Sequence, residues 1–153
     1  MIRIACAGML LLSGCIQTVE RDLGGPNARN MGAPGRGLIV MSPDVSDYAA
    51  VWAQEYYEVQ TKVTPTGARR YTTDPAFRRE VELMGHEIEV QVAVRYYGAE
   101  EGPRRASEAR GLALYEDFRG TRPRAIAREM RRRTDAALAW IAANRTEIEG
   151  RLR

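Results

Sequence analysis

The chain lacks most of the residues on which common catalytic sites depend. Its 153 residues include one histidine, His86, and one lysine, Lys62. A zinc-protease helix needs a second histidine four residues after the first, but Val90 occupies that position, so such a site is excluded. No Gly-x-Ser-x-Gly nucleophile elbow occurs, and the short glycine fragments stand outside any strand–loop–helix pattern that could cradle phosphate. No complete motif for hydrolysis or nucleotide binding is therefore present.

The apolar run near the N-terminus is too short to cross a membrane. Residues 4–12 are apolar, follow the positively charged Arg3, and precede the small residues Ser13 and Gly14. A charged start, a short apolar segment and small residues before a cleavage position are typical of a secretory signal peptide rather than a transmembrane helix. We expect residues 1–14 to be such a signal.

The tetrad Leu12-Ser13-Gly14-Cys15 resembles the lipobox of bacterial lipoproteins. The resemblance implies cleavage before Cys15, a diacylglycerol on its thiol and an acyl group on the new N-terminus. Anchoring by two or more chains is effectively permanent, because each buried methylene contributes about 0.8 kcal/mol. The protein is then expected in the bacterial cell envelope. Since Ile16 rather than an aspartate follows the cysteine, the resemblance favours the periplasmic face of the outer membrane over the inner membrane.

Cysteine usage agrees with this interpretation. Cys6 lies within the signal and would be removed with it, which leaves Cys15 as the only thiol of the mature chain. An intramolecular disulfide is then excluded, and a lone thiol in an oxidising compartment is explained when lipid caps it. We expect covalent lipid on Cys15, no other cofactor and no metal.

The composition is that of an ordinary globular protein, with 44% hydrophobic and 28% charged residues. The net charge of +3 is mild, and nearly all positive charge is arginine. Residues 15–36 are rich in glycine and proline and predict a lipidated N-terminus with a flexible tether. Residues 37–153 then form the folded domain, in which 37–41 are either a short strand or the extended entry to the first helix.

The folded domain predicts an all-α fold, a small bundle of about four helices. Cap residues, first-turn prolines and apolar residues at helical spacing mark the segments 44–61, 74–97, 103–119 and 121 to near the C-terminus. Gly98 is placed to stop the second of these helices.

One face of the predicted helix 74–97 carries Glu82, His86 and Glu89, within about 60° of one another on a helical wheel. An imidazole and two carboxylates could bind a metal, or act as a base with its orienting acids. The same residues could instead be structural, with the ring bonded to Glu82 or to a neighbouring helix, or solvated and paired with Arg78 and Arg79. We favour the structural interpretation, because buried polar groups are usually satisfied and inert.

The last predicted helix carries a cluster of arginines opposite its apolar side. The cluster consists of Arg124, Arg128, Arg131 and Arg132. It could bind an anionic surface such as lipid phosphate, or it could be the ordinary solvated side of an amphipathic helix, paired with Glu129 and Asp135. We favour the ordinary interpretation and expect no nucleic-acid partner for an exported chain.

Together these features predict a lipid-anchored envelope protein with a non-enzymatic binding or structural role. Its partners would be the membrane, through the anchor, and an envelope protein or peptidoglycan. One alternative is a metal-assisted hydrolase that uses Glu82, His86 and Glu89. Another is an envelope lipoprotein derived from a phage or mobile element, which size and anchor permit but no residue specifically indicates.

Overall fold

The computed structural model describes residues 3–4, 16–25, 28–33, 36–108, 112–113 and 115–152. The strands are β1 (Arg3–Ile4), β2 (Ile16–Glu20), β3 (Ala28–Ala33) and β4 (Arg36–Met41). The helices are α1 (Tyr48–Lys62), α2 (Pro65–Thr73), α3 (Pro75–Tyr96), α4 (Glu101–Glu108), the 3-10 helix η2 (Glu116–Phe118), α5 (Pro123–Arg131), α6 (Thr134–Ala143) and α7 (Arg145–Glu149). The predicted lipobox, Leu12 to Cys15, lies outside the described residues.

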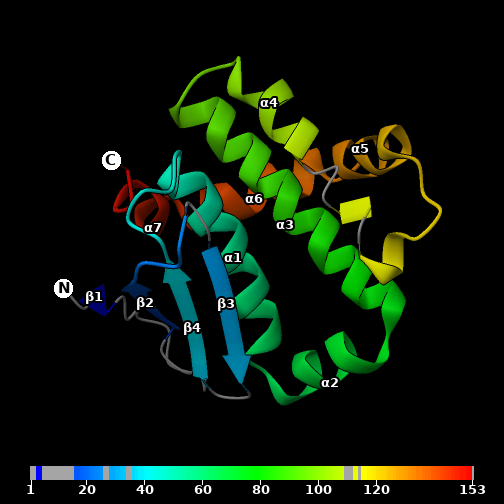
Figure 1. The fold of residues 1–153 in the computed structure, drawn as a ribbon, viewed down its shortest axis with the longest axis horizontal. Helices are drawn as coiled ribbons and strands as arrows, with labels where there is room; N and C mark the ends of the chain where they lie inside the picture. Colours follow the sequence, from blue (N-terminus) through cyan, green and yellow to red (C-terminus); the bar gives the residue numbers. More distant parts are fainter. Residues whose placement is uncertain are drawn as a thin grey trace.

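The prediction of a mainly helical fold is confirmed, and a four-stranded sheet accompanies the helices (Figure 1). The strand order is β1-β2-β4-β3, with β2 parallel to β4 and the other neighbours antiparallel. Thr18, Ile39 and Met41 are buried and share the face of the sheet that packs on α1, as the two-residue period of a strand requires. The indole N–H of Trp52 in α1 donates to the Thr18 hydroxyl at 2.9 Å and joins the two layers.

Part of the range predicted as a flexible tether is therefore ordered. Residues 16–20 form β2 and residues 28–33 form β3, whereas the prediction treated 15–36 as coil. Of the glycines that suggested a tether, Gly24 and Gly25 follow β2 and have positive φ angles, whereas Gly32 lies within β3. The alternating β-branched residues of β2 and their pairing with β4 decided the structure of the segment.

The two central helices occur where they were predicted. The Asp74 carboxylate accepts a hydrogen bond from the backbone N–H of Phe77 at 3.0 Å and starts α3. At the other end, Gly98 has a φ of 130° and donates its N–H to the Ala93 carbonyl, so it ends the helix as expected.

The other helical boundaries differ from the prediction. Residues 64–67 were expected to break the chain, but Thr64 caps α2 by accepting from the N–H of Gly67. The single helix expected from 121 onward is divided into α5, α6 and α7. At the second division, both the backbone N–H and the side-chain amide of Asn144 donate to the Trp140 carbonyl, at 3.0 and 2.8 Å.

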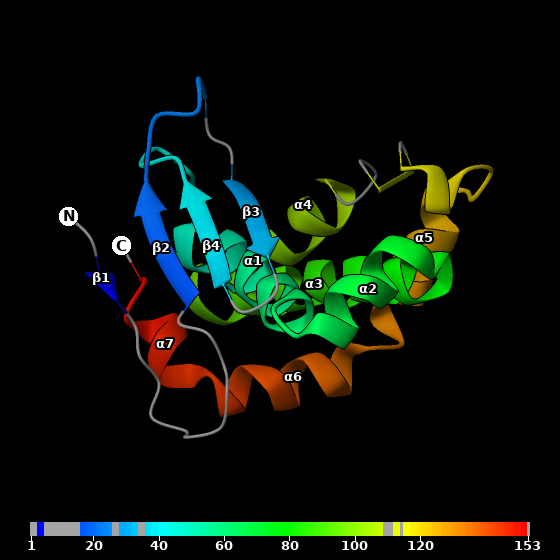
Figure 2. The ribbon, with the colours of Figure 1, turned by 90° about the horizontal axis from the view of Figure 1, so that it is seen from below.

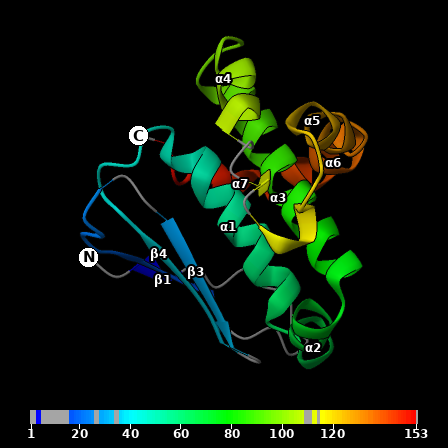
Figure 3. The ribbon, with the colours of Figure 1, turned by 45° about the vertical axis from the view of Figure 1, so that its right-hand side comes forward.

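The elements form three layers, with the sheet on one side of α1 and α3 on the other (Figure 3). The largest core surrounds α1 and includes Trp52, Tyr56 and Ile88, with Ile141 from α6. A smaller cluster joins α3, η2 and α5 through Leu83, Leu112, Phe118, Ile126 and Met130. In the view of Figure 2, α6 lies along one side of the molecule and α4 on the opposite side. Within the described residues, no helix is both long enough and apolar enough to cross a membrane.

Candidate functional site

A row of buried charged side chains separates α1 from α3. Glu55, Glu58 and Lys62 lie on one face of α1, and Glu82, His86 and Glu89 lie on one face of α3; these six residues are termed the polar seam. The spacing of three and four residues places each set on one side of its helix. Glu58 is only 3% exposed and Glu82 only 4% exposed, so these carboxylates have little contact with water.

Gly85 lets the two helices approach at the seam. A Cβ atom at this position would lie 3.2 Å from the Glu58 carboxylate oxygen Oε1 and 3.3 Å from Gln54 Cγ. Glycine in a helix interior costs about 1 kcal/mol relative to alanine, so its presence here is explained by the space that the Glu58 carboxylate occupies.

At one end of the seam, Glu58 and Tyr71 contact the only lysine of the chain. Lys62 Nζ lies 2.9 Å from Glu58 Oε2 and 4.0 Å from the centre of the Tyr71 ring. The Tyr71 hydroxyl donates to Glu82 Oε1. Burial, followed by the nearby Glu58 charge, raises the pKa of Glu82 above its usual range. This end of the seam thus holds a carboxyl group that takes up a proton more readily than an exposed glutamate.

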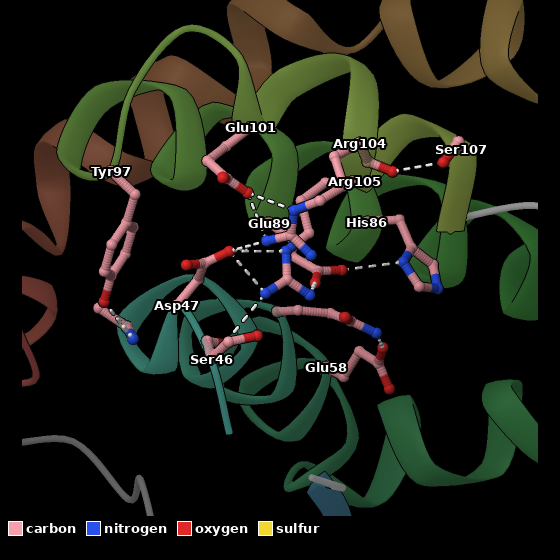
Figure 4. Close-up of polar contacts among 12 residues, drawn as sticks. Ser46, Asp47, Glu58, His86, Glu89, Tyr97, Glu101, Arg104, Arg105 and Ser107 are labelled. Atoms are coloured by element: carbon pink, nitrogen blue, oxygen red, sulfur yellow. Dashed lines mark hydrogen bonds and ion pairs between the residues drawn. The ribbon is translucent and has the colours of Figure 1, made fainter. Parts of the chain in front are cut away.

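At the other end, Glu89 lies between two cationic partners (Figure 4). Its Oε2 is 3.2 Å from His86 Nδ1, and its Oε1 accepts from Arg105 Nη1 at 2.9 Å. Arg105 comes from α4 and is 8% exposed. Its guanidinium also donates to Asp47 Oδ2 at 2.8 Å and to the Ser46 carbonyl at 3.0 Å. A single arginine therefore connects α4, α3 and the start of α1.

Asp47 is placed for this contact rather than for capping α1. It is the N-cap residue of α1, yet its side chain makes no capping hydrogen bond and its φ is 52°. Aspartate enters this left-handed region more easily than most residues, but at some cost. Its carboxylate instead binds Arg104 and Arg105. The backbone of Asp47 thus adopts an uncommon conformation while its side chain joins the ion pairs with α4.

The surrounding carboxylates control the protonation of His86. Burial alone would lower the pKa of His86, but the hydrogen bond to Glu89 and the charges of Glu89, Glu58 and Glu82 outweigh it, and the pKa is raised. The surrounding carboxylates therefore favour the protonated ring, which helps to balance the buried acids.

The structure brings the predicted residues Glu82, His86 and Glu89 together on one face of α3, but each already has a protein partner. Among the described residues, no group of three or more histidine, cysteine, aspartate or glutamate side chains is arranged to hold a metal ion. The arrangement links α1, α3 and α4 through buried polar contacts. The predicted pairing of this face with Arg78 and Arg79 does not occur, because those arginines bind Asp117 and Glu129.

Sequence reasoning missed the partners from other segments. Glu55 and Glu58 stand at helical spacing within 44–61, with Lys62 directly after it, and this charged stripe could have indicated a second polar face. Nothing local indicates that Asp47 and Arg105 meet, since they are 58 residues apart.

The arginine cluster of the last predicted helix lies on the surface. Arg124, Arg128, Arg131 and Arg132 are all exposed, opposite the buried Ile126 and Met130. Among the described side chains, none of the four forms an ion pair, because Glu129 binds Arg79 instead. The predicted lipidation residue, Cys15, lies outside the described residues.

No family model, curated protein or solved structure matches this chain. Its function is therefore argued from its own residues.

Proposed function

We propose that the protein is a lipid-anchored lipoprotein of the bacterial cell envelope with a non-enzymatic binding or structural role at the membrane. One observation carries this proposal: the tetrad Leu12-Ser13-Gly14-Cys15 directly follows a short apolar segment with a charged start. The proposed location is the periplasmic face of the outer membrane, and the proposed partners are the bilayer and an envelope protein or peptidoglycan.

The polar seam supports a structural role for the residues that most resembled a catalytic site. Glu82 already accepts a hydrogen bond from Tyr71, and Glu89 is already paired with Arg105 and His86, so a cation bound there would compete with these partners. Losing the buried Glu89–Arg105 pair would be strongly destabilising, because it leaves a less compensated charge inside the protein. The seam is better suited to fixing the relative positions of α1, α3 and α4 than to exchanging ligands.

The proposal is tested by the mass of the native N-terminal peptide and by two cysteine variants. With intact Cys15, the mature peptide should begin at this residue and carry acyl chains, and the protein should fractionate with membranes. Cys15→Ser should leave the precursor uncleaved. Cys6→Ser is the matched control, because Cys6 lies in the segment that is removed, and its mature product should be indistinguishable from the parent. Normal processing of Cys15→Ser, or an unmodified protein in the cytosol, would contradict the proposal.

A further inference from the structure

We propose that the outer surface of α6, with the arginines at the junction of α5 and α6, rests on the anionic headgroups of the bilayer that holds the lipid anchor. The inference rests on the proposed function and adds to it the orientation of the domain and the chemistry of the surface it contacts. Three observations support it: the exposed face of α6, the direction of β2 and the unpaired arginines.

The exposed face of α6 is unusually apolar. A helix that is apolar all round is normally covered on all sides, whereas one that lies at a surface is usually polar on its outer side. In α6 the buried side carries Ala137 and Ile141, yet the outer side carries Leu138, which is 41% exposed. The other exposed residues on the outer side of α6 are Ala136, Ala139, Ala142 and Ala143, together with Asp135 in the first turn. Apart from this one acid, the outer side of α6 is apolar, unlike the usual solvent-facing side of a surface helix.

The anchor would emerge on the side of the molecule where α6 lies. Figure 2 shows that β2 and β4 both start towards the α6 side and run away from it. Residue 15 precedes the first residue of β2, and consecutive Cα atoms are only about 3.8 Å apart. Ile16 packs beside Val59 over Gly37, and Trp140 of α6 donates to Gln60 at 3.1 Å, so β2 and α6 both flank the last turns of α1. Acyl chains on Cys15 would therefore hold this side of the domain close to the lipid.

The unpaired arginines before α6 match an anionic surface. Arg128, Arg131 and Arg132 precede the helix, are exposed and form no ion pair with any described side chain. Arg145, which follows the helix, is exposed but is paired with Glu149 at 2.6 Å. The arginines between α3 and α5 are likewise neutralised: Arg79 of α3 pairs with Glu129, and Arg133 pairs with Glu80 of α3. Unpaired positive charge is thus retained at the junction of α5 and α6, where lipid phosphates would meet it.

The same charges argue against a second copy of the chain as the occupant. A symmetric dimer buries the same patch on both subunits, so the arginines at the α5–α6 junction would be brought towards their own copies. Like charges placed opposite one another disfavour association, whereas an anionic bilayer attracts them.

The test uses the full-length, lipidated protein reconstituted in vesicles of phosphatidylethanolamine and phosphatidylglycerol. A polarity-sensitive fluorophore is attached at Leu138→Cys, which supplies the only free thiol when Cys15 is lipidated. Ser107→Cys is the matched control, because Ser107 is exposed on α4, on the side opposite α6. We expect the label at 138 to be blue-shifted and shielded from an aqueous quencher, and the label at 107 to remain accessible.

Charge variants separate docking from tethering. Arg131→Gln and Arg132→Gln should each lower the equilibrium constant for docking about fivefold. The aqueous quencher should then reach the label at 138 more readily. Arg21→Gln and Arg69→Gln remove equally exposed arginines elsewhere and should leave the shielding unchanged. Equal quenching at 138 and 107 would overturn the proposal, and so would shielding that depends on protein density, which indicates a second copy. The mass of the N-terminal peptide in the same sample shows whether the anchor is present, so failure of the proposed function is recognised separately.

Discussion

Arg105 shows how much a single buried side chain can determine in this molecule. Its guanidinium binds carboxylates from two segments, Asp47 and Glu89, and the carbonyl of Ser46. An arginine suits this position because its planar donors can serve several acceptors at once, which a lysine cannot do in the same geometry. Arg105 therefore ties α4 to both α3 and the start of α1, and Arg104 adds a second ion pair to Asp47.

We predict that Arg105→Ala lowers the free energy of unfolding by about 3 kcal/mol, because the buried Glu89 then keeps only His86 as a partner and Asp47 keeps only Arg104. Arg69→Ala is the control, since Arg69 is an exposed helical arginine with no ion pair among the described residues, and it should cost no more than about 0.5 kcal/mol. Urea-induced unfolding followed by circular dichroism measures both. Similar midpoints for the two variants would show that the contacts of Arg105 contribute little.

The residues of the seam on α3 could be predicted from the sequence, but their partners could not. Glu82, His86 and Glu89 lie on one helix, so helical periodicity alone places them together. Arg105 reaches Glu89 only because a turn at Gly98 returns the chain over α3, and no periodic signal encodes that direction. Periodicity relates residues within one element, whereas tertiary contacts decide what faces them.

The same limit applies to whole elements. The cap signature Asp74-Pro75 predicted the start of α3. The equivalent signature Thr64-Pro65 marks the start of α2, although residues 64–67 were predicted to break the chain. In both helices, the signal for the start is local in the sequence. By contrast, the sheet depends on pairing between β2 and β4, whose partner residues Thr18 and Ile39 are separated along the chain. Strands of five or six residues carry too little periodic signal to be recognised without that pairing.

Helix α5 carries exposed positive charge at positions where an acidic residue would make the helix more stable. Its first turn contains no acidic residue, although a carboxylate near a helix N-terminus is favourable. Arg124 and Arg128 are four residues apart and repel each other, with no described carboxylate paired to either. A helix selected only for stability would carry an acid at one of these positions.

Arg124→Glu should therefore stabilise the protein, by about 0.5–1 kcal/mol, because the new carboxylate interacts with the helix dipole and with Arg128 one turn later. Arg124→Gln, which removes the repulsion without adding the attraction, should give a smaller gain. Thermal unfolding at low ionic strength measures the difference, and added salt should reduce it. A loss of stability in Arg124→Glu would show that Arg124 has a partner within the fold and is not available to an external surface.

At the scale of the whole molecule, the pH range of greatest stability is set by a carboxyl group whose pKa is lowered and an imidazole whose pKa is raised. The Arg78 guanidinium lowers the pKa of Asp117 below its usual 3.8, so this pair stabilises the fold above that pH and is lost as the pH falls further. The pKa of His86 is raised above its usual 6.5, so its contribution is complete below that pH and is lost as the pH rises through the raised value. The raised pKa of Glu82 acts in the same direction as that of His86. Stability should therefore be greatest in mildly acidic solution.

We predict that the free energy of unfolding decreases as the pH rises above 6.5, and that His86→Gln removes most of this decrease. His86 is the only histidine of the chain, so no other imidazole can produce the same slope. Glutamine keeps a donor near Glu89 but cannot carry the charge, which separates the effect of protonation from that of packing. Urea unfolding at a series of pH values measures the slope in both proteins. An unchanged slope in His86→Gln would show that the carboxylates of the seam do not hold the imidazolium, and that the buried acids are balanced by Arg105 and Lys62 alone.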